Sequence, residues 1–247
     1  VADLEARGVH VITEADLDSP DDTLQNGTVV IRSHGVGKPI YDKLKEKNIS
    51  YVDVTCPFVL KIHRIVEKES LAGNHIIIIG DKDHPEVQGI CGWCQGPYTV
   101  IRNKEEAEVF VPPKGKKISI VSQTTFNYNK FKDLVEILCK KRYDNNVLNI
   151  LNILNTICNA TEERQREAKN IAGEVDTMLV VGGRHSSNTQ KLFEICKKEC
   201  GNTYYIQTPV DLDSEMFQCS SYVGITAGAS TPNKIIEEVQ EHVRIKF

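Results

Sequence analysis

Two cysteines, Cys56 and Cys158, have the same spacing to a polar loop further along the chain. His84 follows Cys56 by 28 residues, and Ser186 follows Cys158 by 28 residues. Each cysteine precedes a predicted helix, whose dipole would stabilise a thiolate and make it a good metal ligand. The separation of 102 residues between the cysteines fits no local ferredoxin or zinc-finger motif. The spacing indicates a metal site that takes one cysteine from each of several repeated units.

Three thiolates on a [4Fe–4S] cluster leave one iron open to a substrate, as chemistry at iron requires. The alternative for either cysteine alone is a buried structural thiol, because free cysteine is commonly buried. Cys91 and Cys94 form a CxxC pair that could be redox-active or half of a zinc site, but no second pair completes it. Cys196 and Cys200, four residues apart on a predicted helix, could chelate a metal, although we favour a packing role.

A second set of residues provides hydrogen-bond donors where predicted strands turn into helices. Backbone N–H groups and helix dipoles at such junctions favour a phosphate or diphosphate. Serine, threonine and asparagine also cap helices there, which is the simpler explanation for any single residue. Because the pattern occurs three times, we favour an anion site. The collected loop residues are His34, Cys56, His84, Glu86, Thr124, Cys158, Ser186, Ser187, Asn188 and Ser230.

The elements that must position these residues form an internal repeat. Short β-rich runs alternate with helical stretches, a pattern typical of an α/β fold with parallel sheets. Three times, a strand leads through a link to a second strand and a polar loop. The three copies cover residues 9–35, 98–125 and 204–230. In the second and third copies a further apolar strand comes first, ending in Gly80 and Gly182 respectively.

The repeat predicts three pseudo-equivalent small α/β units with mainly parallel sheets. Ligands bind beyond the carboxyl ends of such strands, so we expect the loops to surround one central cavity for cluster and substrate. The expected boundaries of the units are 1–70, 71–172 and 173–247. Residues 147–157 fit helical and strand periodicity equally, and by analogy with the run before Cys56 we expect their second half to be a strand.

The same repeat predicts that the first unit is incomplete. His84 to Thr124 spans 40 residues, as does Ser186 to Thr226. The equivalent loop of the first unit is therefore expected roughly 40 residues before His34, upstream of Val1. Residues 1–8 are consistent with this expectation, since they read as the end of a helix closed by a glycine.

Composition narrows the class of protein. Of the 247 residues, 40% are hydrophobic and 26% charged, as in ordinary globular proteins. The formal charge of -4 argues against a nucleic-acid surface, which needs a clearly basic face. The longest apolar run, residues 76–79, is too short to span a membrane. No segment reads as a secretory signal, so we expect a cytoplasmic protein with reduced thiols.

Short motifs around the polar loops occur in order along the whole chain. They are Ser33-His-Gly-Val, Val54-Thr-Cys-Pro, His84-Pro-Glu-Val-Gln-Gly, Ser122-Gln-Thr-Thr, Asn155-Thr-Ile-Cys-Asn-Ala-Thr, Ser186-Ser-Asn and Thr226-Ala-Gly-Ala-Ser. Together they resemble the LytB (IspH) family of 4-hydroxy-3-methylbut-2-enyl diphosphate reductases. The resemblance implies an oxidoreductase of the last step of the methylerythritol phosphate route to isoprenoids. In this step, two-electron reductive dehydroxylation of the (E)-allylic diphosphate gives isopentenyl and dimethylallyl diphosphate.

The resemblance also implies a cofactor and an electron donor. Cys56 and Cys158 correspond to two of the three cysteine ligands of a [4Fe–4S] cluster. The third ligand, and a histidine that follows it in the family, are expected upstream of Val1. Electrons would arrive one at a time from ferredoxin or flavodoxin.

The family's active-site roles fall on the polar loops. Glu86 corresponds to the proton relay, which acts through Thr124 on the substrate hydroxyl. His34 corresponds to a histidine that faces the diphosphate, and His84 to one that faces the polar groups of the substrate. The substrate-binding residues that the resemblance implies are His34, His84, Thr124, Ser186, Ser187, Asn188 and Ser230.

Two other functions account for part of the sequence. A catalytically inert remnant of the same family, which binds diphosphates without a stable cluster, fits the same motifs. A sugar-phosphate-binding or isomerase domain is suggested by the run from Gly182 to Asn188, but it leaves the cysteine spacing unexplained.

Overall fold

The computed structural model describes residues 2–18, 24, 26–144, 151–218 and 220–246. The chain divides into two compact units. We call residues 1–123 with 137–156 the N-terminal unit, and residues 124–136 with 157–247 the C-terminal unit. The described strands form three separate sheets, and every strand pairing in them is parallel. The predicted α/β class with parallel sheets is thus confirmed.

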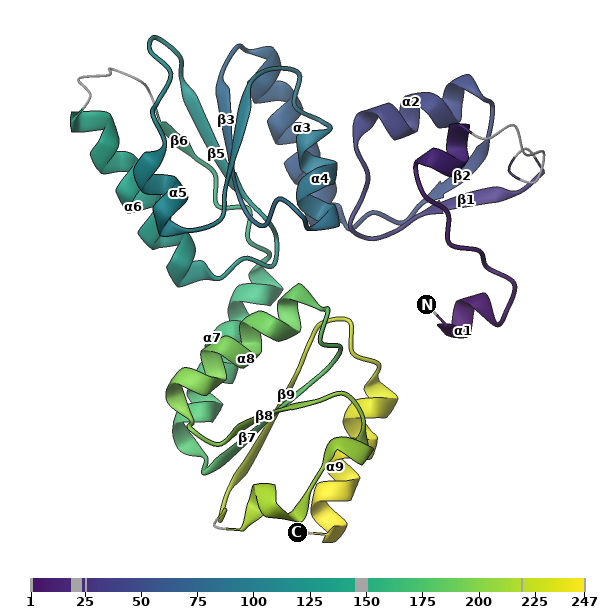
Figure 1. The fold of residues 1–247 in the computed structure, drawn as a ribbon, viewed down its shortest axis with the longest axis vertical. Coiled ribbons are helices and arrows are strands. Elements are labelled where there is room, and N and C mark those ends of the chain that lie inside the picture. Colours follow the sequence, from purple (N-terminus) through teal and green to yellow (C-terminus); the bar gives the residue numbers. More distant parts are fainter. Residues whose placement is uncertain (1, 19–23, 25, 145–150, 219, 247) are drawn as a thin grey trace. The chain divides into compact units, whose positions relative to one another are not determined.

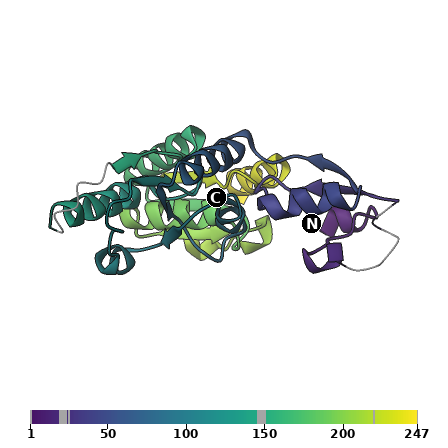
Figure 2. The ribbon, with the colours of Figure 1, turned by 90° about the horizontal axis from the view of Figure 1, so that it is seen from above.

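The first sheet of the N-terminal unit is small. Its strands β1 (Thr28–Ile31) and β2 (Ser50–Asp53) pair in register, and helix α2 (Lys38–Glu46) covers one face (Figures 1 and 2). Leu44 and Tyr41 of α2 pack on Ile31 there. The sheet stays partly open to solvent, since Val30 is 60% exposed. The short α1 (Ala2–Glu5) and a 3₁₀ turn, η1 (Ala15–Asp18), precede it.

The second sheet of this unit has the strand order β4-β3-β5-β6. Helices α3 and α4 lie on one face, and α5 and α6 on the other (Figure 1). Strand β3 is buried along its whole length, as expected for the centre of a parallel sheet. The bounds are α3 Pro57–Leu71, β3 His75–Ile79, α4 Pro85–Cys91, β4 Tyr98–Ile101, α5 Lys104–Val109, β5 Ile118–Ser122, α6 Tyr128–Asp144 and β6 Leu151–Ile153.

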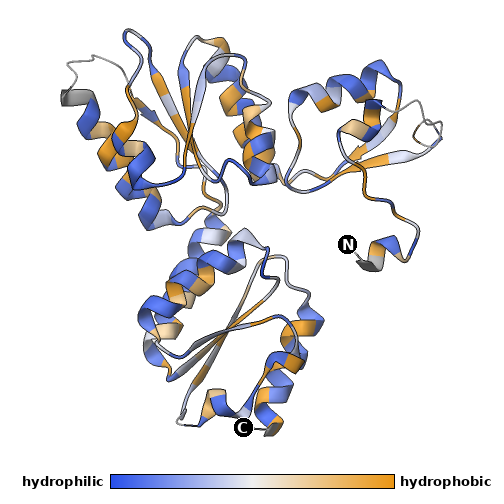
Figure 3. Cartoon of the chain, viewed as in Figure 1, coloured by the Kyte–Doolittle hydropathy of each residue, from blue (hydrophilic) through white to orange (hydrophobic). Residues whose placement is uncertain are grey.

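The C-terminal unit repeats this arrangement with three strands in the order β8-β7-β9. Helices α7 and α8 cover one face and α9 the other (Figure 1), and in Figure 3 hydrophobic residues line the strands between them. Cores on both faces bury strand β7 completely. The bounds are α7 Asn159–Glu174, β7 Thr177–Val181, α8 Ser187–Glu199, β8 Thr203–Ile206, η2 Pro209–Asp211, η3 Ser214–Phe217, β9 Val223–Ala227 and α9 Asn233–Lys246.

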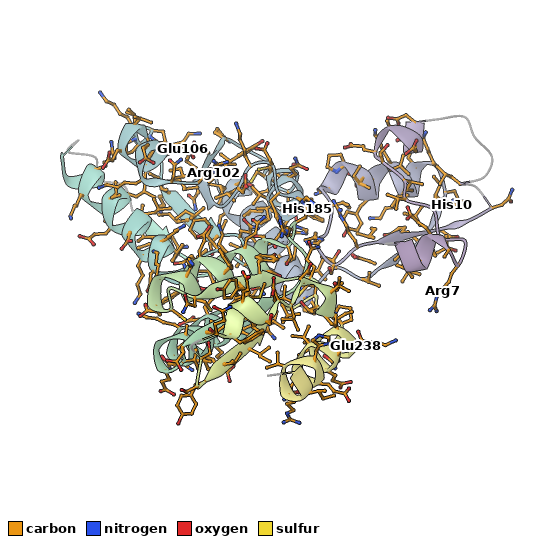
Figure 4. The ribbon with its side chains drawn as sticks, turned by 60° about the horizontal axis from the view of Figure 1, so that its bottom comes forward. Arg7, His10, Arg102, Glu106, His185 and Glu238 are labelled. Atoms are coloured by element: carbon orange, nitrogen blue, oxygen red, sulfur yellow. The ribbon has the colours of Figure 1, made fainter. Side chains whose placement is uncertain are left out.

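The internal repeat is visible in individual hydrogen bonds. Gly80 N donates to Ile101 O at 3.0 Å, and Gly182 N donates to Ile206 O at 2.8 Å. In the loops that follow β4 and β8, a carboxylate accepts from the backbone four residues earlier. These bonds join Arg102 N to Glu106 and Gln207 N to Asp211; Figure 4 labels the first pair. The copies therefore share backbone geometry as well as sequence.

Two local predictions are confirmed and one is wrong. Helix α1 is closed by Gly8 in a left-handed conformation (φ 85°), and the second half of residues 147–157 forms β6. Residues 147–150 lie outside the described part of the chain. Residues 9–12, predicted to be a strand, are irregular. Their equivalents β4 and β8 pair with β3 and β7, and the first sheet has no such strand among the described residues. Without a partner, a strand cannot form its ladder of hydrogen bonds.

The boundaries of the repeat units, 1–70, 71–172 and 173–247, stay a prediction. The described part of the chain contains no helix long and apolar enough to cross a membrane.

Candidate functional site

Every predicted site residue follows the carboxyl end of a parallel strand. This is where open α/β sheets bind ligands. The N-terminal unit brings together His34, Cys56, His84 and Glu86, which follow β1, β2 and β3. The C-terminal unit contains Thr124, Cys158, Ser186, Ser187, Asn188 and Ser230, which follow β5, β6, β7 and β9.

The two cysteines have equivalent surroundings. Cys56 is the N-cap of α3 and Cys158 is the N-cap of α7, and neither side chain forms a capping hydrogen bond. The backbone N–H of Cys56 donates to Ser33 O at 3.0 Å, and that of Cys158 donates to Thr124 O at 3.0 Å. Both thiols are free and partly exposed. Each cysteine is thus held at a helix N-terminus with its thiol partly exposed.

This geometry suits a thiolate ligand of a soft metal centre. Among the described residues, no group of three or more His, Cys, Asp or Glu side chains is close enough to hold a metal ion by itself. The N-terminal unit contains Cys56 and the C-terminal unit contains Cys158. The donor chemistry therefore agrees with an iron–sulfur centre that takes its thiolates from separate elements.

His34 and His84 lie in contact. Their ring centroids are 5.4 Å apart in an edge-to-face arrangement. Nδ1 of His34 is buried without a hydrogen-bond partner among the described residues. Burial, with a smaller effect from Arg32, lowers the pKa of His34 below its usual value. The pair therefore presents a neutral imidazole that retains the capacity to bind a polar ligand.

Helix α4 positions a carboxyl group beside these histidines. His84 is its N-cap, and Nδ1 of His84 accepts a hydrogen bond from Glu86 N at 3.2 Å. Pro85 at the first helical position fixes the start of the helix. The Glu86 side chain is only 2% exposed. A carboxyl group held in the first turn of a helix and shielded from water can transfer a proton directionally.

In the C-terminal unit, the N-terminus of α8 gathers polar groups. Oγ of Ser186 caps the helix by accepting from Thr189 N at 3.3 Å, and Oγ of Ser187 lies 3.3 Å from Oγ1 of Thr125. Asn188 is 5% exposed, yet neither atom of its amide has a partner among the described residues. A buried amide without partners is costly unless a ligand satisfies it. The helix dipole makes an anion the favoured ligand.

Two further residues of this loop region are exposed. Ser230 follows β9, and His185 precedes the cap of α8, where Figure 4 labels it. Both are accessible to a ligand, but the structure records no hydrogen bond of either side chain that would hold it in place.

The remaining cysteine pairs behave as packing residues. Cys91 and Cys94 lie against the core between α3, α4 and β3. Burial raises the pKa of both thiols, that of Cys94 to about 12. Burial likewise raises the pKa of Cys196 to about 12, and Cys196 and Cys200 belong to the core under α8. The raised pKa values make Cys91, Cys94 and Cys196 poorly suited to metal binding or redox exchange.

Sequence reasoning missed one buried group beside the site. His63 is 1% exposed and stacks on Trp93, with ring centroids 5.2 Å apart. Its spacing of seven residues from Cys56 is the feature of the sequence that could have indicated its position near the site. Two helical turns place both residues on the same face of α3.

Comparisons with known proteins show what the chain is similar to. The family model described as LytB protein matches residues 1–244. A protein of Caldanaerobacter subterraneus subsp. tengcongensis, named 4-hydroxy-3-methylbut-2-enyl diphosphate reductase, is 45% identical over 99% of this chain and 81% of its own length. The protein of the same name from Alkaliphilus oremlandii is 45% identical over 98% of this chain and 82% of its own.

Solved structures show the same likeness. The E-1-hydroxy-2-methyl-but-2-enyl-4-diphosphate reductase of Plasmodium falciparum is 27% identical, with a TM-score of 0.87 over 99% of this chain and 73% of that chain. A second structure, of (E)-4-hydroxy-3-methyl-but-2-enyl diphosphate reductase, is 36% identical, with a TM-score of 0.60 over 92% of this chain and 79% of that chain.

Proposed function

Because the chain belongs to the LytB protein family, which matches it over residues 1–244, we propose that it is a 4-hydroxy-3-methylbut-2-enyl diphosphate reductase. With two electrons and two protons, the hydroxyl group of the (E)-allylic diphosphate leaves as water, and protonation at either end of the allyl group yields isopentenyl and dimethylallyl diphosphate. This is the last step of the methylerythritol phosphate route. The observation that best supports the proposal is the matched pair Cys56 and Cys158, with equal backbone hydrogen bonds at two helix N-termini.

The diphosphate is held by hydroxyl, amide and imidazole groups. In the C-terminal unit Ser186, Ser187, Asn188 and Ser230 bind its oxygens, and the N-terminus of α8 adds its dipole. The partnerless amide of Asn188 supports this role, since the amide gains its hydrogen bonds only when a ligand is bound. In the N-terminal unit His34 faces the diphosphate and His84 faces the polar groups of the substrate.

Glu86 supplies the proton that turns the hydroxyl into a leaving group, and Thr124 orients that hydroxyl. Hydroxide is a poor leaving group, so proton transfer from a positioned carboxyl group lowers the barrier. The buried first turn of α4 supports this role, because it holds the carboxyl group away from bulk water.

Cys56 and Cys158 would hold a [4Fe–4S] cluster together with a third thiolate. When bound, the cluster supplies a Lewis-acidic open iron and a conduit for electrons. Ferredoxin or flavodoxin is the expected donor of those electrons.

The test combines metal content with turnover. The chain is first joined at its N-terminus to the segment that carries the third cysteine in the LytB family. This extended chain and its variants Cys56→Ser and Cys158→Ser are reconstituted anaerobically, assayed for iron and acid-labile sulfide, and then for turnover with reduced methyl viologen. We expect both variants to lose cluster and turnover, and the control Cys91→Ser to keep them. An unchanged cluster in Cys56→Ser would refute the ligand assignment. Binding of pyrophosphate without any iron would instead favour the inert diphosphate-binding remnant.

A further inference from the structure

Trp93 connects the two cores of the N-terminal unit. It lies in the turn after α4 and packs both on the core between α3, α4 and β3 and on the core between α2 and β1. Its indole Nε1 donates a hydrogen bond to Val36 O at 2.9 Å. Val36 is two residues after His34. The indole therefore ties the loop that carries His34 to the helix that carries His84.

His63 lies beside the same loop, next to Gly35. Its ring stacks on Trp93 with an interplanar angle of 18°. A Cβ added to Gly35 would lie 2.7 Å from Cε1 of His63 and 3.0 Å from Cγ2 of Thr55. The imidazole therefore lies against Gly35, which is next to His34 in the chain. Gly35 in turn lies against Thr55, which is next to Cys56. Neither ring nitrogen has a hydrogen-bond partner among the described residues, so the ring acts as a flat packing surface.

Helix α4 packs directly on the backbone of this loop. A Cβ added to Gly92 would lie 2.6 Å from the Cα of Gly37, and one added to Gly89 would lie 3.5 Å from Val36 C. Such close approach leaves the loop little freedom to slide along the helix. The separation of 5.4 Å between the rings of His34 and His84 is consequently set by these contacts.

We propose that Trp93 and His63 are positioning residues for the substrate-binding histidines. The indole hydrogen bond and the stacked imidazole hold the loop from Ser33 to Val36 against α4, so that His34 faces His84. The substrate-binding role of His34 in this proposal rests on the proposed function. The contacts themselves do not depend on it.

The first test follows His34 itself. Nuclear magnetic resonance titration of its ring is compared in the parent and two variants. Trp93→Phe removes the indole donor to Val36 O and reduces the bicyclic ring to a single aromatic ring, and His63→Ala removes the stacked imidazole. We expect the pKa of His34 to be depressed in the parent and to rise toward 6.5 in both variants, because a loosened loop exposes the ring. His75→Ala removes another buried histidine, which lies at the start of β3 beside Phe110, and should leave His34 unchanged.

An unchanged His34 titration in either variant would overturn the proposal. If His63→Ala does not fold, Trp93→Phe alone decides, since it preserves an aromatic ring at that position. A rise of the same size in His75→Ala would also overturn it, because the effect would then come from general loss of stability.

The second test measures ligand binding. Inorganic pyrophosphate is titrated calorimetrically into the same proteins, and we expect about five- to tenfold weaker binding in Trp93→Phe and His63→Ala, the loss of about one hydrogen bond. In turnover, KM should rise by a similar factor while kcat and iron content stay within about twofold. Binding and KM equal to those of the parent would contradict the proposal. A parent that binds no pyrophosphate would contradict the proposed function, and the His34 titration would still decide the positioning role.

Discussion

At the scale of single residues, the candidate site contrasts two kinds of buried polar group. Glu86 is buried in the first turn of α4, beside the histidine pair, whereas His63 is buried beside an indole and has no hydrogen-bond partner among the described residues. The first arrangement suits a group that exchanges a proton with a ligand. The second arrangement suits a side chain that stays neutral and acts only through the packing of its ring.

Replacing Glu86 with glutamine should abolish proton delivery while keeping the shape of the side chain. We expect kcat to fall by about 10²- to 10⁴-fold, the usual contribution of a general acid. Pyrophosphate binding should remain within about twofold of the parent. The control Glu67→Gln removes a carboxylate that only pairs with Lys38 near the surface, and it should keep full turnover. Equal rates in Glu86→Gln and the parent would exclude Glu86 as the proton source.

The protonation of His63 predicts a loss of stability in acid. Burial lowers its pKa from 6.5 to about 4 in the folded protein, so the unfolded chain binds more protons between these values. The stability contributed by neutral His63 is therefore complete above pH 6.5 and is lost as the pH falls toward 4, by about 3 kcal/mol at most. The pKa values of His34 and His75 are lowered in the same direction and add to the loss.

Urea denaturation at a series of pH values measures this loss. We expect the free energy of unfolding to decrease below pH 6.5, and His63→Leu to flatten that part of the curve. A variant with the same pH dependence as the parent would show that His63 is not responsible.

At the scale of elements, the repeated strand, loop and helix determine where the polar residues lie. Sequence spacing correctly predicted the strand ends before Cys56, His84, Cys158 and Ser186, because each loop lies within a few residues of its own strand. It could not predict the contact of α4 with the first loop. That contact depends on two glycines far apart in the chain, whose close approach no local pattern encodes.

The contact between α4 and the first loop can be tested by adding one methyl group. Gly92→Ala places a Cβ 2.6 Å from the Cα of Gly37, a backbone atom that cannot move aside easily. We expect a loss of stability of about 1–3 kcal/mol from overpacking. Gly173→Ala is the matched control, because it lies in α7 with no atom within 4 Å of the added Cβ. That change should stabilise the protein by roughly 0.4–1 kcal/mol. Equal melting temperatures for the two variants would contradict the packing argument.

At the scale of the whole molecule, the three sheets differ in how well they are covered. Strands β3 and β7 are buried over their whole lengths by helices on both faces. The sheet of β1 and β2 has two strands, and Val30 and Val52 are more than half exposed. A two-stranded sheet is marginally stable without further packing.

Amide hydrogen exchange should reflect this difference. We expect the slowest exchange in β3 and β7 and exchange faster by orders of magnitude in β1 and β2, because local opening there breaks fewer buried contacts. Exchange in β1 as slow as in β3 would mean that the first sheet is covered by something that the described residues do not include.

The sequence by itself determined the parallel α/β class, the repeat and the residues at the strand ends. These properties depend on alternation and spacing within a few tens of residues, which a single chain displays directly. The tertiary structure decided which loops touch. Three features depend on neighbours distant in the chain: the contact of His34 with His84, the stacking of His63 on Trp93, and the irregular course of residues 9–12. A strand or a site side chain takes its final form only when its packing partner is present, and that partner is not encoded locally.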